Sequence, residues 1–377
     1  MIERIMQKSI EEQLFRGRVI ILYGARRVGK TTLVKNILKS QVNSRYVNCD
    51  LLPNQLALKE HNVEMLRGFL GHDKLIVLDE AQRVENIGMT LKIIADELPD
   101  IQVVATGSSS FDLANKTGEP LTGRMRQLIL APLTLGEIEQ VSAVRPFDAI
   151  ADKVLRLGSY PFAVLESDSE ARENLDELAG NYLYRDVLEH ERVRRPELLL
   201  KLLQALAFQI GNEVSVNELS NLLGASKSVV DNYLDLLEKC FVIFRLRPLA
   251  RNLRNELSRK SKVYFHDLGV RNSLIQNYSP LALRQDQGAL WENFCIAERM
   301  RVNALTRHKA NYYFWRTLGG KEIDLVEERD GIYSGFEFKW GESKAKATTI
   351  NEFIAAYNGA TVQTISRSNC YEYFKLI

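Results

Sequence analysis

The residues from Gly24 to Thr31 have the types and the spacing that hold a phosphate group. They read Gly24-x-x-x-x-Gly29-Lys30-Thr31 and lie between an apolar run, VIILY, and a stretch with helical periodicity. The glycines let backbone N–H groups curve around a phosphate at the positive end of the helix. Lys30 would then reach the β- and γ-phosphates of a nucleotide, and the Thr31 hydroxyl would ligate Mg²⁺. The predicted nucleotide contacts are Gly24, Ala25, Arg26, Arg27, Val28, Gly29, Lys30, Thr31, Thr32 and Asp79.

A pair of acids, Asp79 and Glu80, ends a second apolar run, KLIVLDE. Asp79 at a strand end could hold the Mg²⁺ shell, and Glu80 could polarise an attacking water as a general base. A third run, IQVVATGSSS, ends in the hydroxyl residues Thr106 and Ser108, which either sense the γ-phosphate or simply end a strand. The guanine-reading motif NKxD is missing, because NKTG at Asn115 lacks the aspartate. ATP is therefore the predicted nucleotide.

A third group of polar residues stands near the end of the chain. EIDLV and GFEFKW are predicted to form two strands joined by an RDG turn, so that Glu337 and Lys339 share one face and Asp324 lies beside them. Asp324 and Glu337, with Glu292 from the preceding helix, would hold Mg²⁺ or Mn²⁺, and Lys339 would orient an attacking water. The pattern is that of restriction endonucleases. An ordinary half-exposed hairpin with a cross-strand ion pair shows the same alternation, and this alternative stays open.

The middle of the chain is predicted to be helical. Residues 146–190 would form a helical lid or linker, and EVSVNELSNLLGASKSVVDNYLDLLEK would form two helices joined by a turn at Gly224. CFVIFRLRP and KVYFHD would add two strands, which gives a helix-turn-helix with a wing. The segment 245–262 carries a single acid, Glu256, and could contact DNA phosphates, although winged helices also bind proteins. Its basic residues are Arg245, Arg247, Arg251, Arg254, Arg259, Lys260 and Lys262.

The order of these motifs resembles one family over nearly the whole chain. GARRVGKTTL, LIVLDEAQRV, ATGSSS, LTGRMRQLILAPLTLGEI and LGSYPFAVLE are similar to the AAA-type ATPases of bacteria and archaea whose C-terminal half has an uncharacterised function. The resemblance implies an AAA-like α/β core that can act as a homo-oligomer. It also implies that Arg124, in TGR, is a catalytic arginine near the ATP, where it would stabilise the transferring phosphoryl group. Arg126 is the alternative, and donation within or between chains is left open.

The composition sets outer limits on the function. With 45% hydrophobic and 26% charged residues, the chain has the composition of a soluble globular protein. A net charge of +2 means that any contact with DNA must come from a local patch. The four cysteines lie far apart without a CxxC pair, which predicts reduced thiols in a cytoplasm. No apolar run has the length of a membrane span, so no membrane contact is expected.

We therefore predict an α/β protein with four parts. These are an AAA-like P-loop ATPase domain (1–145), a helical lid or linker (146–190), a winged-helix domain (191–285) and an α/β restriction-endonuclease-like domain (286–377). The predicted function is an ATPase whose nucleotide state controls a DNA-interacting, and in one interpretation nucleolytic, C-terminal half. The alternative is a slowly hydrolysing regulatory or assembly switch that binds a protein partner. ATP turnover with and without DNA would separate the two.

Overall fold

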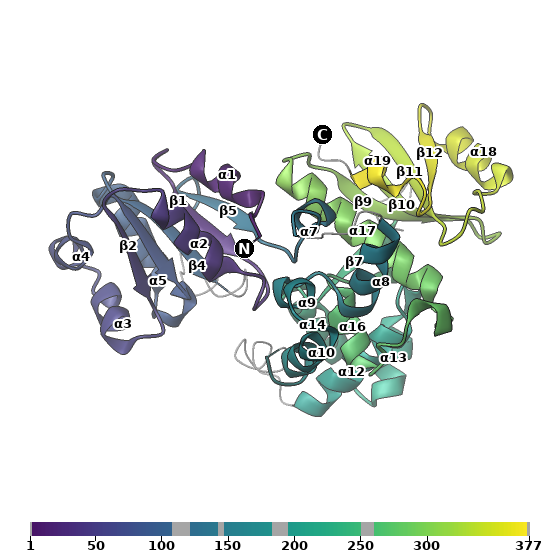
Figure 1. The fold of residues 1–377 in the computed structure, drawn as a ribbon, viewed down its shortest axis with the longest axis horizontal. Coiled ribbons are helices and arrows are strands. Elements are labelled where there is room, and N and C mark those ends of the chain that lie inside the picture. Colours follow the sequence, from purple (N-terminus) through teal and green to yellow (C-terminus); the bar gives the residue numbers. More distant parts are fainter. Residues whose placement is uncertain (1, 108–120, 142–146, 183–194, 250–259, 375–377) are drawn as a thin grey trace.

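The computed structural model describes residues 2–107, 121–141, 147–182, 195–249 and 260–374. Figure 1 shows a parallel-sheet domain on the left, a group of helices at the lower right, and a second sheet at the upper right. Some of the predictions concern residues outside the described ranges, and the structure does not address them. These residues are Ser108, Arg251, Arg254, Glu256 and Arg259.

The first sheet has five parallel strands among the described residues, in the order β2-β3-β4-β1-β5. Strands β1, β3 and β4 are buried along their whole length, as expected for continuous apolar runs with helices on both faces. The three strands predicted around these runs are confirmed. Their carboxyl ends meet at one edge of the sheet. The strands are β1 (Val19–Tyr23), β2 (Ser44–Asn48), β3 (Leu75–Asp79), β4 (Gln102–Gly107) and β5 (Met125–Ile129).

Helices cover both faces of this sheet. Buried side chains of α1 and α2 share one core with Ile20 and Leu22, whereas those of α3, α4 and α5 pack with Ile21 and Tyr23 on the other face. This division follows from the strand period, because neighbouring residues of β1 point to opposite sides. The helices are α1 (Met6–Glu11), α2 (Lys30–Lys39), α3 (Leu52–Lys59), α4 (Val63–Leu70) and α5 (Ile87–Glu97), with a 3₁₀ turn at Ala81–Arg83.

The helical region packs as one body, with α8 and α10 directly against α16. The predicted pair of helices is present as α13 and α14. Gly224 ends α13 with a φ of 60°, and the Ser226 hydroxyl accepts the Val229 N–H at 3.4 Å to begin α14. The helices are α7 (Leu135–Ile138), α8 (Phe147–Leu157), α9 (Pro161–Leu165), α10 (Asp168–Glu177), a π-helical turn (Leu178–Tyr182), α12 (Pro196–Phe208), α13 (Val216–Leu223), α14 (Lys227–Lys239) and α16 (Leu268–Leu274).

The second sheet joins the middle of the chain to its end. Among the described residues it has seven strands in the order β12-β11-β10-β9-β7-β8-β6, and β7 pairs with β9 in parallel. The predicted turn between β10 and β11 is present, with φ values of 51° at Asp330 and 82° at Gly331. The strands are β6 (Glu213–Val214), β7 (Ile243–Pro248), β8 (Ser261–Phe265), β9 (Asn311–Arg316), β10 (Glu322–Arg329), β11 (Ile332–Phe338) and β12 (Thr361–Ile365). The remaining elements are a 3₁₀ turn (Leu281–Leu283), α17 (Gln287–Leu305), α18 (Ala347–Ala356) and α19 (Cys370–Phe374).

Candidate functional site

The phosphate-binding loop leaves β1 and enters α2, as the sequence pattern requires. Gly24 has a φ of 154°, and a Cβ atom there would lie 2.2 Å from the carbonyl oxygen of Leu130, so only glycine fits. Gly29 has a φ of 96° and immediately precedes α2. The loop therefore places its backbone at the amino end of a ten-residue helix, where N–H groups favour an anion.

Lys30 is buried within this loop and donates to two of its backbone carbonyls. Its Nζ donates to the carbonyl oxygens of Gly24 at 2.8 Å and Ala25 at 2.9 Å. Only 5% of the residue is exposed. These contacts hold the ammonium group at the amino end of α2, where an anion is favoured.

Asp79 is the centre of the hydrogen-bond network at the end of β3. Its Oδ2 accepts the hydroxyls of Thr31 at 2.8 Å and Tyr46 at 2.5 Å, and its Oδ1 accepts the Thr106 hydroxyl at 2.5 Å. Burial and the Asp79 carboxylate both raise the pKa of Tyr46, which keeps this phenol a donor. Thr31 and Asp79 thus present two hard oxygen donors side by side, a set that suits Mg²⁺. The sequence did not indicate Tyr46, because SRYVN lacks an apolar or alternating pattern.

Glu80 follows Asp79 in a left-handed conformation, with a φ of 54°. Its backbone N–H donates to the Thr106 hydroxyl at 3.0 Å, and its Oε2 accepts the Gln82 amide at 2.5 Å. A non-glycine residue in this region of φ is uncommon and is held by its surroundings. The two contacts fix both the backbone and the carboxylate of Glu80 next to the Asp79 network.

Arg124 lies at the far end of the sheet from the loop. Its carbonyl oxygen accepts the Val19 N–H at 2.9 Å, and its Nε donates to Asp96 Oδ1 at 2.6 Å. Tyr23, next to the loop, pairs instead with Ile129. Five residues of strand separate the two ends by about 16 Å, so the expectation that Arg124 lies near the ATP is wrong for the nucleotide of its own chain. Arg124 could therefore act only on an ATP molecule bound by a neighbouring chain.

Two arginines tie the loop to distant parts of the chain. Arg27 donates to Asn174 Oδ1 at 2.8 Å and to Glu177 Oε2 at 2.6 Å, both on α10. Arg4 donates to the carbonyl oxygen of Val28 at 2.7 Å and to the buried Glu137 carboxylate at 3.0 Å. A change of the loop on nucleotide binding would therefore act directly on α10 and α7.

The four residues of the predicted C-terminal site lie close together, with Asp324 on β10, Glu337 and Lys339 at the end of β11, and Glu292 on α17. The pairing of Leu325 with Phe336 places Asp324 opposite Glu337, and Lys339 Nζ donates to Glu337 Oε1 at 2.7 Å. Burial raises the pKa of Asp324 well above its usual range, and the nearby Glu292 and Glu337 carboxylates raise it further. These groups thus share one buried, charged environment.

Lys262 of β8 occupies the centre of this environment. Its Nζ donates to Glu292 Oε1 at 3.0 Å and also pairs with Glu322, while the Tyr264 hydroxyl donates to Glu292 Oε1 at 2.5 Å. Burial lowers the pKa of Lys262, but Glu292, Asp324 and Glu322 more than offset this and raise it. We refer to Lys262, Glu292, Glu322, Asp324, Glu337 and Lys339 as the Lys262 cluster.

The predicted Mg²⁺ or Mn²⁺ site is not formed by this cluster. Across the ranges that the structure describes, no three His, Cys, Asp or Glu side chains are grouped to hold a metal ion. Protein groups hold part of these carboxylates: Lys262 and Tyr264 hold Glu292, and Lys339 holds Glu337 Oε1, whereas Glu337 Oε2 is buried without a hydrogen-bond partner among the described residues. The metal site predicted from Asp324, Glu337 and Glu292 is thus not assembled in this arrangement, and metal binding by these residues stays a prediction.

The basic segment is also more neutral than its sequence indicates. Lys262 is 3% exposed, so the expectation that it contacts DNA phosphates is wrong. Arg245 pairs with Asp235 at 2.6 Å and with Glu238, and Lys260 pairs with Glu218 at 3.1 Å. Among the described basic residues of this segment, Arg247 is exposed without a carboxylate partner. Of the four described basic residues of this segment, three are thus committed to contacts within the protein, and Arg251, Arg254 and Arg259 lie outside the described ranges.

Comparisons with known proteins agree with the nucleotide site. The fold and the loop define the first domain as a P-loop ATPase domain, and residues 16–139 match the family model of an AAA domain. Residues 149–281 and 287–370 match models described as domains of unknown function, DUF8612 and DUF4143. Neither description assigns an endonuclease-like fold or a DNA-binding role to the second half.

Similar proteins cover most of the chain. Uncharacterised proteins of Mycobacterium tuberculosis and Methanocaldococcus jannaschii are 29% and 25% identical over 88% and 86% of this chain, and over 72% and 75% of their own length. The structure resembles the Walker-type ATPase of Pyrococcus abyssi with a TM-score of 0.51 at 19% identity, covering 73% of this chain and 96% of that one. No helix in the described part of the chain is long and apolar enough to cross a bilayer.

Proposed function

We propose that this protein is an ATP-hydrolysing switch. The nucleotide held by the first domain sets the arrangement of the two regions that follow it, residues 149–281 and 287–370. The observation that carries the proposal is the Asp79 network beside the buried Lys30. The Lys30 ammonium group, a pair of hard oxygen donors and the Glu80 carboxylate lie together at one edge of a parallel sheet. Ligands bind at this edge in such sheets.

Each residue has a defined task in this proposal. Lys30 exchanges the Gly24 and Ala25 carbonyls for phosphate oxygens, and Thr31 and Asp79 hold Mg²⁺. When bound, the ion neutralises charge that develops on the transferring phosphoryl group. Glu80 accepts the proton of the attacking water. Tyr46 and Thr106 hold the Asp79 carboxylate in place by donating to both of its oxygens.

The route from the loop to the C-terminal domain consists of direct hydrogen bonds. Arg4 links Val28 of the loop to Glu137 of α7, and the neighbouring Leu135 N–H donates to Glu298 Oε1 of α17 at 2.6 Å. Helix α17 also carries Glu292 of the Lys262 cluster. The nucleotide state could therefore shift α17, since α7 holds this helix at Glu298 and strand β8 of the second sheet holds it at Glu292.

Replacement of Glu80 tests the proposal. Glu80→Gln keeps the amide oxygen for Gln82 and leaves Thr31 and Asp79 untouched, so affinity for a fluorescent ATP analogue should stay within a few-fold of wild type. ATP turnover should fall by about 10²- to 10⁴-fold because the base is lost. Glu60→Gln, an exposed carboxylate on the same domain, is the control and should leave both quantities unchanged. Wild-type turnover in Glu80→Gln would remove the general-base role.

DNA interaction by the second half is the second candidate function. It is supported by the proximity of Asp324, Glu337 and Lys339 and by the exposed Arg247. If the second half binds DNA, its affinity for a duplex should fall as the salt concentration rises. Arg247→Ala should then make the slope of log affinity against log salt concentration shallower by about one. If duplex DNA neither binds nor changes ATP turnover, the switch acts on a protein partner.

A further inference from the structure

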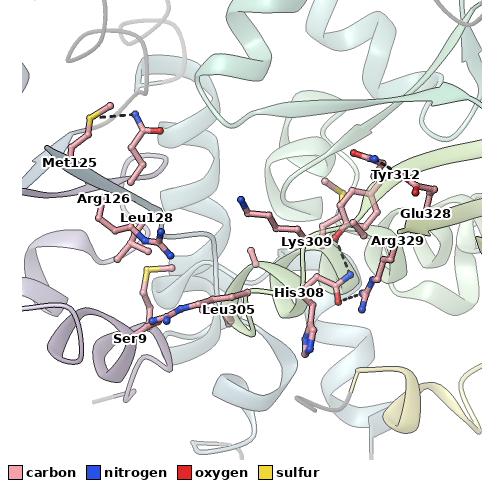
Figure 2. A pocket seen from close by; sticks show the side chains of 18 of the residues that line it. Ser9, Met125, Arg126, Leu128, Leu305, His308, Lys309, Tyr312, Glu328 and Arg329 are labelled. Carbon is pink, nitrogen blue, oxygen red and sulfur yellow. Dashed lines mark hydrogen bonds between the residues drawn. The ribbon is translucent and has the colours of Figure 1, made fainter. Parts of the chain in front are cut away.

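A large cleft separates the outer edge of the first domain from the C-terminal domain (Figure 2). Its volume is about 1110 Å³, more than most small-ligand pockets have. One wall is β5 with part of α1, and the other is the end of α17 with the turn into β9 and the β10–β11 turn. The cleft lies apart from both the P-loop and the Lys262 cluster, so the proposed function does not account for it.

The wall formed by β5 presents free backbone groups. Val19 N–H donates to the Arg124 carbonyl and Leu130 N–H donates to the Tyr23 carbonyl, so alternate residues of this strand face β1. Met125, Gln127 and Ile129 must then direct their N–H and C=O groups outward. Among the described residues no other strand pairs with this edge. An edge of this kind is a template for another strand.

Cations stand on both walls of the cleft, and Glu328 and Asp330 also line the C-terminal wall. Arg126 of β5 and Lys309 are both exposed, and neither has an ion-pair partner among the described residues. Figure 2 shows Lys309 extending from the C-terminal wall towards β5. Arg307 also lines the cleft, paired with the half-exposed Glu12 at 3.7 Å. Leu128 and Leu305 add apolar side chains to the lining of the cleft.

We propose that this cleft binds an extended acidic segment of a partner protein, which adds as a strand to the outer edge of β5. The outward N–H and C=O groups supply main-chain hydrogen bonds, the recognition mode known as β-strand addition. Arg126 and Lys309 select carboxylate side chains, and Leu128 and Leu305 contact apolar ones. A nucleic acid fits less well, because it has no groups to match the alternating N–H and C=O of a strand edge and would meet only two uncommitted cations.

The inference rests on the proposed function only in that it names the partner of the switch. Binding is therefore measured without nucleotide, by fluorescence anisotropy, and its failure would not bear on ATP turnover. The probe is a fluorescein-labelled ten-residue peptide of alternating glutamate and valine. It should bind at least ten-fold more tightly than the same design with lysine in place of glutamate. Equal or absent binding of both peptides overturns the proposal.

The backbone contribution is tested at Gln127. Gln127→Pro removes one outward N–H but spares the pairing with β1, and proline is tolerated at such edge positions. Gln127→Ala is the matched control, since it removes the same side chain and keeps the N–H. The proline variant should weaken peptide binding at least ten-fold, the alanine variant less than two-fold, with melting temperatures close to each other. Equal affinities for the two variants overturn strand addition.

The charge contribution is tested by reversing the two cations. Arg126→Glu combined with Lys309→Glu should weaken binding of the acidic peptide at least ten-fold and allow the lysine peptide to bind. Lys201→Glu, an exposed lysine on α12 outside the cleft, should change neither. A labelled oligothymidylate of ten nucleotides tests whether the cleft prefers a nucleic acid to an acidic peptide. If it binds more tightly than the acidic peptide and Gln127→Pro leaves it unaffected, the cleft is a nucleic-acid site and the proposal fails.

Discussion

Two buried lysines, Lys30 in the P-loop and Lys262 in the second sheet, show how differently one side chain can be used. Lys30 is 5% exposed and Lys262 is 3% exposed. Lys30 donates to two backbone carbonyl oxygens of its loop, whereas Lys262 pairs with the carboxylates of Glu292 and Glu322. The first arrangement holds the ammonium group at the amino end of a helix, where an anion is favoured, and the second uses it to offset buried acids. Burial alone therefore does not mark a binding lysine; its place at a helix end does.

The largest effect should come from removing the cation of the Lys262 cluster. Lys262→Met leaves Glu292, Glu322 and Asp324 without their shared counter-ion, and breaking a buried ion pair in this way costs about 3–5 kcal/mol of stability. Thermal unfolding should show a clearly lower melting temperature, with ATP turnover unchanged at temperatures where the variant is folded. Adding Glu292→Gln should restore part of the loss. An unchanged melting temperature would mean that Lys262 does not neutralise the cluster.

Replacing Lys30 should have the reverse effect, with a large loss of ATP turnover and a small loss of stability. Lys30→Ala takes away a preorganised cation, which typically costs about 10²- to 10³-fold in turnover, while the melting temperature should fall less than in Lys262→Met, where buried carboxylates lose their counter-ion. Lys39→Ala, at the exposed end of the same helix, is the control and should keep wild-type turnover. The contrast between the two lysines is lost if Lys30→Ala hydrolyses ATP normally or unfolds as readily as Lys262→Met.

A smaller effect is expected from Glu298, the buried acid between the two regions. Burial raises its pKa to about 7, with Arg301 opposing the shift. The folded protein therefore binds this proton more tightly than the unfolded chain, whose pKa is near 4.5, so the stability it contributes falls as the pH rises from about 4.5 to 7.

Glu298→Gln cannot titrate and should show a flatter dependence of melting temperature on pH. The difference in stability between wild type and the variant should change by about 1–3 kcal/mol between pH 5 and 8, in favour of wild type at the acidic end. The exposed Glu97→Gln serves as the control and should follow wild type. Parallel curves for wild type and Glu298→Gln would show that Glu298 is ionised throughout this range.

The smallest effect is predicted for Arg124. Its pair with Asp96 is partly exposed, so Arg124→Ala should alter stability by less than about 1 kcal/mol. Because Arg124 lies far from the loop of its own chain, turnover in dilute solution should match wild type. A loss of turnover that appears only at high protein concentration would show donation to a neighbouring chain. A loss that is independent of concentration would contradict the placement of Arg124.

Local patterns in the sequence predicted the first domain well. The loop depends on glycines within eight residues, and buried parallel strands are continuous apolar runs, so Val19–Tyr23, Leu75–Asp79 and Gln102–Gly107 were all recognisable. Strand β5 and Tyr46 of β2 were missed, because an edge strand and a half-buried strand lack that signal. Whether Asp79 and Glu80 act on ATP stays a prediction.

The second half was harder to predict because its contacts are remote in sequence. Lys262 stands in a basic segment and has the appearance of a surface residue, yet its partners are Glu292 and Glu322, 30 and 60 positions away. The sequence correctly predicted that Asp324, Glu337 and Lys339 lie on one face of the hairpin, because the alternation of side chains along two adjacent strands depends only on nearby residues. It could not show that a lysine from another strand would be inserted among the carboxylates.

The parallel pairing of β7 with β9 has a consequence for how such proteins arise. Arg247 lies opposite Tyr313, so one sheet crosses the gap between residues 281 and 287, where one family of domains ends and the next begins. A gene rearrangement at that gap would leave each product with an open strand edge, which favours aggregation. Selection should therefore retain recombinants that inherit both domains. We expect the two families to be found as a pair more often than apart.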